Sequence, residues 1–421
     1  MAAASAVEPL PVDGTVAVVG AGLAGLRAAE TLRQEGFRGT IVLVGEEHHD
    51  PYDRPPLSKQ VLAGTWPPER TVLADREKLG SLEIDARLGH RAVSLDAEAR
   101  RLYLDDGGVV GADGIILATG ASPRRLPGTE PNDGVLVLRT IDDALELRRR
   151  VVEVGPGARV VVIGAGFIGS EVASTCHELG SQVDVVEMLE TPLEPILGAG
   201  IGKIFGALHE EHDVRLHVGT AVEAISTPGD AGHASTGGRA GSVTLSDGSS
   251  LPADVVVLGI GVTPSVAWLT DSGLSVGDGV QCDGRLFAAP GVVAAGDLAR
   301  WPHPVIGRDV RIEHWQVAAE AGVAAARSLV RGDAADAFDP VPYFWSDQYG
   351  VRIQMLGLPS PTDEVSVVSG DTESCRFVAL YGGEGRLTAA LAISRPRQLM
   401  AFRPLLAKGA SWDEALALDL T

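Results

Sequence analysis

The chain has 421 residues, of which 45% are hydrophobic and 22% are charged, a composition that excludes global disorder. At ~150 residues per domain, this length predicts about three domains. The formal net charge of −21 argues against nucleic acids and anionic membrane surfaces as partners. No apolar run approaches the ~18 residues of a membrane helix. Since Met1–Gly14 also carries no Lys or Arg, we expect a cytoplasmic protein without a targeting segment.

A glycine fingerprint opens the first part of the chain. The apolar run Thr15–Val19 predicts a buried strand, and Gly20, Gly22 and Gly25 follow it in the order of a dinucleotide-binding turn. The first glycine permits the tight turn, the second lets the backbone touch a pyrophosphate, and the third lets helix and strand pack closely. The following helix directs its N-terminus at the phosphate charge. Alone, this fingerprint is a weak indication of function.

A second copy strengthens that interpretation. After another predicted strand, Gly164, Gly166 and Gly169 repeat the glycine spacing. Residues 112–123 and 253–264 also resemble each other, since each has an apolar strand that runs into a glycine turn. They are separated by nearly the same distance in sequence as the two fingerprints. The chain is therefore predicted to contain two similarly built units, each of which holds one dinucleotide.

An acidic residue follows the next predicted strand of each unit. Glu46 follows Ile41–Val44 and Glu187 follows Val183–Val186, about 20 residues past the last glycine of the fingerprint. A carboxylate there accepts hydrogen bonds from both ribose hydroxyls and repels a 2′-phosphate. In the alternative interpretation both are ordinary solvated strand ends. The upstream glycines favour the ribose role.

The cysteines argue against one class of redox site. Cys176, Cys282 and Cys375 have neither CxxC nor CxxxxC spacing, and no cysteine precedes them. This excludes a redox-active disulfide of local spacing. Cys176 lies in the helix predicted after the second fingerprint, where we expect a small core residue.

The later segments complete the predicted elements. Pro228–Ser242 is rich in Gly, Ala and Ser and predicts a flexible hairpin loop. Val292–Asp297 predicts a strand that ends in an acid, and Glu313–Leu329 predicts an Ala-rich helix. From Pro340 onward, alternating runs predict an antiparallel sheet in a third domain.

Residues 300–311 form a candidate basic patch in this acidic chain. Arg300, Arg308 and Arg311 lie close together in sequence, with His303 between them. Such a patch would dock an acidic protein partner. Scattered solvated charges are an equally good interpretation.

Four segments resemble one known family. They are Tyr52–Lys59 (YDRPPLSK), Gly166–Glu171 (GFIGSE), Ala294–Asp297 (AAGD) and Phe344–Tyr349 (FWSDQY). Together they resemble the NADH-dependent ferredoxin reductases of oxygenase systems, the putidaredoxin, rhodocoxin and biphenyl dioxygenase reductases, which are FAD-dependent pyridine nucleotide oxidoreductases. The resemblance covers nearly the whole chain. Apoptosis-inducing factor is a more distant relative.

The resemblance implies an α/β fold like that of glutathione reductase, with two Rossmann-like dinucleotide-binding domains and a C-terminal α+β domain. Residues 14–125 and 256–332 would form a discontinuous FAD-binding domain. Residues 126–255 would form the NAD-binding domain, and residues 333–421 the C-terminal domain. FAD would occupy the first fingerprint and NADH the second.

The resemblance also assigns site residues. The residues expected at FAD are Gly20, Gly22, Ala24, Gly25, Glu46, Arg54, Lys59, Ala92, Arg139, Asp297 and Trp315. The residues expected at NADH are Gly164, Gly166, Ile168, Gly169, Glu171, Glu187 and Gly261. Lys59 and Glu171 are the predicted catalytic residues, and no metal site is predicted.

These assignments have a physical basis. Lys59 lies on a proline-anchored loop, and its ammonium group near flavin N5 would favour negative charge on the reduced ring. Glu171 is its expected partner, because an uncompensated buried charge costs several kcal/mol; the alternative is that both are surface charges. Asp297 would bind ribitol hydroxyls, and Trp315 would place the start of a helix against the flavin. Trp345 is expected either to face the flavin or to pack between domains.

The implied function is electron transfer from NADH through FAD to a small iron–sulfur ferredoxin that serves a cytochrome P450 or a ring-hydroxylating dioxygenase. The protein would be a monomer or a weak homodimer. A rubredoxin is an alternative acceptor. A redox-gated NADH-binding protein like apoptosis-inducing factor is an alternative of another class. The cysteine positions disfavour a thiol-based disulfide reductase or peroxidase.

Overall fold

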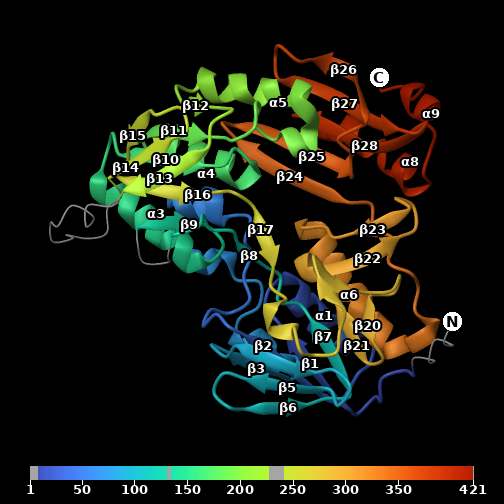
Figure 1. Cartoon of the computed structure of the whole chain (residues 1–421). Helices are drawn as coiled ribbons and strands as arrows, with labels where there is room; N and C mark the ends of the chain where they lie inside the picture. The colour runs from blue at the N-terminus through green and yellow to red at the C-terminus, as the bar shows by residue number, and fades with distance from the viewer. Residues whose placement is uncertain (1–7, 130–133, 227–240, 421) are drawn as a thin grey trace.

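The computed structural model describes residues 8–129, 134–226 and 241–420. One six-stranded and two five-stranded sheets organise these residues. In Figure 1 the first sheet lies at the bottom, the second at the upper left and the third at the upper right. None of the described helices is long and apolar enough to cross a membrane. The predicted α/β architecture with a separate C-terminal sheet is confirmed.

The first sheet has the strand order β20-β21-β7-β1-β2-β3, with parallel pairing except between β20 and β21. Its strands are β1 (Thr15–Val19), β2 (Thr40–Gly45), β3 (Ile84–Leu88), β7 (Gly114–Leu117), β20 (Phe287–Ala289) and β21 (Val292–Ala294). The central strands are buried along nearly their whole length, as is typical of a parallel sheet covered on both faces. Helices α1 (Leu23–Gln34) and α6 (Trp315–Arg331) pack against each other and against this sheet.

The second sheet is built from the residues that separate the two parts of the first. Its order is β12-β11-β10-β16-β9, all parallel. Its strands are β9 (Val135–Val137), β10 (Arg159–Ile163), β11 (Gln182–Val186), β12 (Arg215–His217) and β16 (Val255–Leu258). Val160 and Val162 face helices α3 (Ile141–Val154) and α4 (Phe167–Glu178), whereas Val161 packs with the opposite layer. That layer is the antiparallel sheet β13 (Val222–Ser226), β14 (Ser242–Leu245) and β15 (Ser250–Pro252).

Two short strands connect the first and second sheets. β8 (Ala121–Pro123) leaves the first sheet and β17 (Val262–Pro264) returns to it. The two strands pair antiparallel, with Pro123 opposite Val262. They are the ends of the repeated segments 112–123 and 253–264. The chain therefore enters and leaves the second unit at one place (Figure 1).

The third sheet, β24-β25-β28-β27-β26, is antiparallel, as the alternating runs predict. Its strands are β24 (Tyr343–Gln348), β25 (Val351–Gly357), β26 (Glu364–Asp371), β27 (Arg376–Gly383) and β28 (Arg386–Ile393). Phe377 on one face packs with Phe205 of helix α5 (Glu194–Glu211), and Val378 on the other face packs with Phe402. The short helices on this second face are α7 (Pro396–Met400), α8 (Arg403–Ala407) and α9 (Trp412–Leu416). The sheet is thus covered on both sides, and α5 of the second unit packs against one of its faces (Figure 1).

The remaining elements are small. They are α2 (Arg76–Ser81), β4 (Ala92–Asp96), β5 (Arg101–Leu104), β6 (Val109–Gly111), β18 (Val276–Gly277), β19 (Gly279–Gln281), β22 (Ala299–His303) and β23 (Arg308–Val310), with short 3-10 turns between them. The predicted strand 292–297 ends at Ala294, because Asp297 lies in the 3-10 turn Gly296–Leu298. Strands β13 and β14 pair on either side of the Gly-rich segment 228–242, most of which lies outside the described residues.

Candidate functional site

The first glycine turn has the geometry that its fingerprint requires. Gly20 has φ of +116°, and a Cβ atom there would lie 2.1 Å from the carbonyl oxygen of Ala118. A Cβ atom on Gly25 would lie 1.9 Å from the carbonyl oxygen of Gly20. Only glycine therefore allows this turn and this approach of α1 to β1. Gly22 has open space beside its Cα atom, where a phosphate can reach the backbone.

The second glycine turn repeats this geometry. Gly164 has φ of +101°, and a Cβ atom on Gly169 would lie 2.0 Å from the Gly164 carbonyl oxygen. Gly166 is again open, with its nearest neighbour 3.8 Å from a Cβ atom placed there. Neither α1 nor α4 has a side-chain cap or an acidic residue in its first turn, so both N-termini suit an anion. The two turns fit two dinucleotide pyrophosphates.

The acidic residues of the two turns differ in how they are held. The Glu187 carboxylate accepts hydrogen bonds from the backbone N–H groups of Ala165 at 2.8 Å and Leu189 at 2.9 Å. These bonds fix it beside the second glycine turn. Glu46 is exposed at the end of β2, and its neighbour Glu47 is engaged by other side chains. The ribose role of Glu46 and Glu187 fits these positions and stays a prediction.

A hydrogen-bonded network joins distant segments around Arg54. Arg54 donates to Glu47 Oε1 at 2.8 Å and to the backbone carbonyl oxygen of Arg139. Tyr52 Oη donates to Glu47 Oε2 at 2.5 Å, and burial raises the pKa of Tyr52 well above its usual value. Arg139 donates to Asp297 Oδ2 at 2.8 Å. Arg54, Arg139 and Asp297, which the resemblance assigns to one ligand, are therefore brought together by the fold.

The other residues assigned to the first turn are buried or half-buried. The Cβ atom of Ala24 lies 3.1 Å from a Cβ atom placed on Gly296, next to Asp297. Ala92 is buried at the start of β4. α6 begins at Trp315, two residues later than the predicted start at Glu313, and Trp315 Nε1 donates to Asp53 Oδ1 at 2.5 Å. Burial raises the pKa of the Asp53 carboxyl group.

Trp345 packs next to this group. Its ring lies edge-on to Trp315 with 6.0 Å between the centroids, and it is stacked on Tyr343 at 6.0 Å. Trp345 therefore joins the third sheet to the start of α6. This contact agrees with the packing role expected for it, and a role toward the flavin stays a prediction.

The two predicted catalytic residues are in contact. Lys59 Nζ donates to Glu171 Oε2 at 2.7 Å, and the side chains are 14% and 3% exposed, respectively. The interpretation of both as surface charges is therefore wrong. Lys59 lies in a π-helical turn, Leu57–Val61, rather than in an irregular loop, and Pro56 is the N-cap of that turn. The pair joins the first unit to α4 of the second, and its catalytic role stays a prediction.

Two residues assigned to the nicotinamide nucleotide leave open surface near the second turn. Ile168 on α4 is 49% exposed, although it is large and apolar. Gly261 has φ of +91° with open space beside its Cα atom. It lies two residues past Gly259, where a Cβ atom would lie 3.0 Å from the Cα atom of Gly169. This side of the second turn is thus free to contact a ligand.

Motif reasoning missed several polar partners. Glu47, Tyr52 and Asp53 hold the assigned residues in place, and Ser58 and Ser346 donate to Glu171. All except Glu47 lie within segments that carry the resemblance. Membership of those segments was the available signal, but no local pattern indicates which distant residue each would bond.

The thiols do not suit disulfide chemistry. All three cysteines are free, and Cys176 and Cys282 lie in hydrophobic cores. Burial raises the pKa of each of these two thiols to about 12. Both therefore stay protonated and unreactive at neutral pH. The expectation that Cys176 is a core residue is confirmed.

The interpretation of residues 300–311 as a basic patch is wrong. Arg300 pairs with Asp278 at 3.2 Å, and Arg311 pairs with the same carboxylate at 3.0 Å. His303 is buried, and burial lowers its pKa, so that it is neutral at pH 7. Asp278 and Glu313 thus offset the charges of Arg300 and Arg311, whereas Arg308 is exposed, so the three arginines form no joint positive surface.

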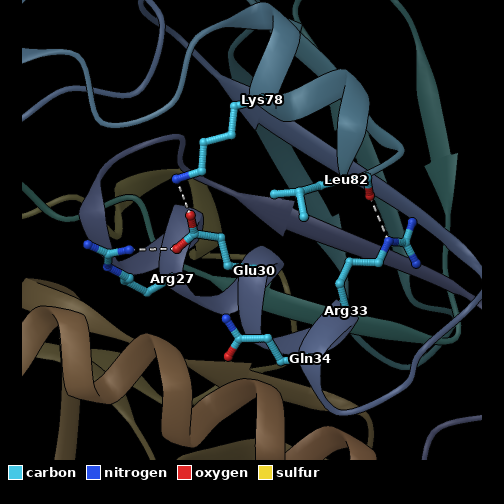
Figure 2. Close-up of a pocket in the computed structure, with 6 residues that line it drawn as sticks. All are labelled: Arg27, Glu30, Arg33, Gln34, Lys78 and Leu82. Carbon is cyan, nitrogen blue, oxygen red and sulfur yellow. Dashed lines mark hydrogen bonds and ion pairs between the residues drawn. The ribbon is translucent and has the colours of Figure 1, made fainter.

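A surface hollow of about 450 Å³ lies between α1 and α2, and Figure 2 shows the residues that line it. Its lining residues are Arg27, Glu30, Arg33, Gln34, Lys78 and Leu82. Glu30 is paired with Arg27 at 2.7 Å and Lys78 at 2.6 Å, and Arg33 donates to the backbone carbonyl oxygen of Leu82. The hollow lies past the first turn of α1, not at the glycine turn. Because the charged side chains that line the hollow pair with other groups of the protein, we assign no ligand to it.

Comparisons with known proteins identify the relatives of the chain. Residues 14–322 match the family model of the pyridine nucleotide-disulphide oxidoreductases, and residues 343–421 match the reductase C-terminal model. The chain is 38% identical to the anthranilate 1,2-dioxygenase system ferredoxin–NAD(+) reductase component of Burkholderia cepacia over 96% of this chain and 97% of that protein. It is 36% identical to rhodocoxin reductase of Rhodococcus erythropolis over 93% and 89%, respectively.

A solved structure extends the agreement to three dimensions. The covalent putidaredoxin reductase–putidaredoxin complex matches with a TM-score of 0.89 and 30% identity over 96% of each chain. The resemblance inferred from the sequence motifs is confirmed. The chain therefore belongs to the pyridine nucleotide-disulphide oxidoreductase family, and it is an oxidoreductase that uses FAD and NAD(H).

Proposed function

We propose that the protein passes electrons from NADH through FAD to a small iron–sulfur ferredoxin that serves a cytochrome P450 or a ring-hydroxylating dioxygenase. The observation that carries the proposal is the buried Lys59–Glu171 pair, which joins the unit of the first glycine turn to the helix of the second. The names of the relatives, which are ferredoxin reductase components, support the choice of acceptor.

The proposal divides the chain by ligand. Residues 14–125 and 256–332 would hold FAD, residues 126–255 would hold NADH, and residues 333–421 would complete the site. The pairing of β8 with β17 supports a division near these bounds, since it marks where the chain passes between the first and second sheets. Because β16 (Val255–Leu258) pairs within the second sheet, the boundary after that unit lies past Leu258 rather than at residue 255. We expect a monomer or a weak homodimer.

The residues at the first turn would bind and orient FAD. The turn at Gly22 receives the pyrophosphate, and Glu46 would accept hydrogen bonds from ribose hydroxyls. Arg139 and Asp297 present a positive and a negative group side by side, a donor and an acceptor for a polar ligand. When bound, FAD would supply hydride acceptance from NADH and release of single electrons, so the residues of this chain need to bind and orient it rather than act as a general base.

The residues at the second turn would select and position NADH. The Glu187 carboxylate is fixed by two backbone N–H groups. In that position it could accept hydrogen bonds from ribose hydroxyl groups and repel a 2′-phosphate. Lys59 supplies a fixed positive charge in a mostly buried place, where charge acts more strongly than in water. Glu171 keeps that ammonium group in position and compensates it.

The test uses the purified, FAD-containing protein. We expect NADH to reduce it, and a [2Fe–2S] ferredoxin of an oxygenase system to reoxidise it in repeated turnover, followed by the absorbance of the ferredoxin. Ferricyanide is the control acceptor, because it needs no docking surface. Turnover with ferricyanide or a rubredoxin but with none of a panel of ferredoxins would contradict the proposed acceptor.

A second measurement separates this function from thiol chemistry. Alkylation of accessible cysteines should leave turnover from NADH to ferricyanide unchanged, because two of the three thiols are buried. A loss of turnover that tracks the modification of Cys375 would favour a thiol-based enzyme instead.

A further inference from the structure

One face of helix α4 bonds to two other parts of the molecule. Glu171, Ser174 and Thr175 lie three and four positions apart, so they share this face. Thr175 Oγ1 donates to the carbonyl oxygen of Ser58 at 2.7 Å, in the turn that carries Lys59. Ser174 Oγ accepts the backbone N–H of Tyr349 at 2.8 Å, at the end of β24. The helix is therefore held between the first unit and the third sheet.

The Glu171 carboxylate is the centre of this junction. Its Oε2 atom accepts from Lys59 Nζ at 2.7 Å and from Ser58 Oγ at 2.5 Å. Its Oε1 atom accepts from Ser346 Oγ at 2.7 Å. A carboxylate that is 3% exposed needs partners for both oxygens. Lys59 and Ser58 meet one oxygen, and Ser346 of the third sheet meets the other.

The Ser346 hydroxyl is itself oriented. Its side chain is fully buried, and its Oγ atom accepts a hydrogen bond from Gln348 Nε2 at 3.2 Å. Because the Gln348 amide occupies an acceptor position, the hydroxyl proton is free to point at Glu171. The carboxylate is therefore held in one rotamer by a donor that comes from outside both nucleotide units. Lys59 bonds only the Oε2 atom of Glu171, so the rotamer of Glu171 determines where the Lys59 ammonium group lies.

We propose that Ser346 is a positioning residue for the reaction: through Glu171 Oε1 it fixes the Lys59 ammonium group at the place where the hydride is transferred. The inference rests on the proposed role of Lys59 beside the flavin. It gives the C-terminal domain a part in the transfer of the hydride from NADH. The transfer itself remains a two-electron step between nicotinamide and flavin, to which Ser346 contributes no proton or electron.

The test compares Ser346→Ala with Ser328→Ala in the FAD-containing protein. Ser328, which lies on α6, is a matched control. It is also buried, and its hydroxyl group donates to the carbonyl oxygen of Arg285 at 2.7 Å. We expect Ser346→Ala to lower the limiting rate of flavin reduction about tenfold, the usual effect of one hydrogen bond to a charged group. The apparent dissociation constant for NADH should stay the same. Ser346→Thr, which keeps the hydroxyl, should recover most of the rate.

A second readout does not depend on activity. The chain has four lysines, Lys59, Lys78, Lys203 and Lys408, so labelling by an amine-specific reagent resolves each of them by mass spectrometry. Lys59 should be labelled several-fold faster in Ser346→Ala than in Ser328→Ala, while the other three serve as internal references. The flavin midpoint potential should also fall in Ser346→Ala, because a displaced ammonium group stabilises the reduced ring less.

The proposal is overturned if Ser346→Ala matches Ser328→Ala in both Lys59 labelling and limiting reduction rate. Faster Lys59 labelling with an unchanged reduction rate also overturns it, because the contact would then be structural only. If Ser346→Ala does not fold, Ser346→Cys keeps the volume with a weaker donor and must show the same two effects. Failure of the wild-type protein to reduce any ferredoxin would reject the proposed acceptor without changing these outcomes.

Discussion

The two glycine turns share a backbone but differ in what surrounds them. Around the first, side chains from several distant segments converge, since Arg54, Arg139 and Asp297 form one network. Around the second, the fixed polar group is Glu187, which is held by backbone N–H groups of its own neighbourhood. If the first turn holds FAD and the second NADH, as proposed, residues from distant segments would enclose FAD, whereas NADH would be held mainly by residues near its own turn. Lys59 and Glu171 connect the two.

The largest effect should separate the folding role of the glycines from their binding role. Gly20→Ala combines a positive φ with a Cβ atom 2.1 Å from a carbonyl oxygen, which we expect to cost about 4 kcal/mol or more of folding stability. Gly22→Ala meets no atom within 4 Å, so it should fold normally and lose FAD. Thermal unfolding and flavin content measure the two effects. Equal melting temperatures for the two variants would contradict the assigned roles.

The next effect tests the pair that connects the turns. Lys59→Ala should slow flavin reduction by NADH about 100-fold in stopped-flow measurements, as is usual when one preorganised charge at the reacting atoms is removed. It should also destabilise the protein by about 3 kcal/mol, because Glu171 is left buried and uncompensated.

The double variant Lys59→Met with Glu171→Gln separates these two consequences. It removes both charges, so it should regain much of the stability while reduction stays slow. Recovery of the wild-type reduction rate in the double variant would contradict the proposed electrostatic role of Lys59.

The acidic residues should respond unequally if the two turns bind their ligands differently. Glu187→Gln should raise the KM for NADH about tenfold and narrow the preference over NADPH, because the carboxylate no longer repels a 2′-phosphate. Glu46→Gln should weaken the affinity for FAD by less than tenfold, since we expect other groups also to hold FAD. An unchanged KM for NADH in Glu187→Gln would reject the ribose assignment.

The smallest effect concerns a buried histidine, His209, near the second turn and a half-buried one, His314, near the first. His209 bonds Ser170 on α4, and His314 precedes Trp315; burial lowers the pKa of each to about 4. Because the unfolded chain takes up these protons near pH 6.5 and the folded protein does not, stability is complete above that pH and falls as the pH drops toward 4.

We expect each histidine to cost roughly 1 to 2 kcal/mol of stability at pH 5.5. Melting temperatures between pH 7.5 and 5 measure this loss. His209→Gln and His314→Gln should each flatten part of the slope. A slope that neither variant changes would assign the loss to other groups.

Local patterns predicted those parts of the site that depend on local backbone. The glycine turns, the acids that follow the next strands, and the alternating runs of the third sheet are all set within short segments. The partners of Glu171 were not predictable in the same way. Ser58 and Ser346 lie 113 and 175 positions from it, so their contact depends on how three parts of the molecule pack.

The error at residues 300–311 has a similar origin. Positive residues that are neighbours in sequence suggested a patch, but Asp278, in the turn between β18 and β19, pairs with both Arg300 and Arg311, and Glu313 also pairs with Arg311. The sequence shows how the positive residues are spaced along the chain. Whether they form a positive surface depends on which acidic residues the fold places beside them. The Lys59–Glu171 contact was expected correctly because burial of one charge demands the other.

The pairing of β8 with β17 has a consequence for the history of the chain. Because the entry and exit strands are neighbours, the intervening 138 residues between Pro123 and Val262 form a side branch of the first unit. Removing or exchanging that branch would require closing a gap of only ~5 Å, one strand spacing, without rethreading the remainder. Such an arrangement would allow the second unit to be acquired by gene insertion and later exchanged for another domain.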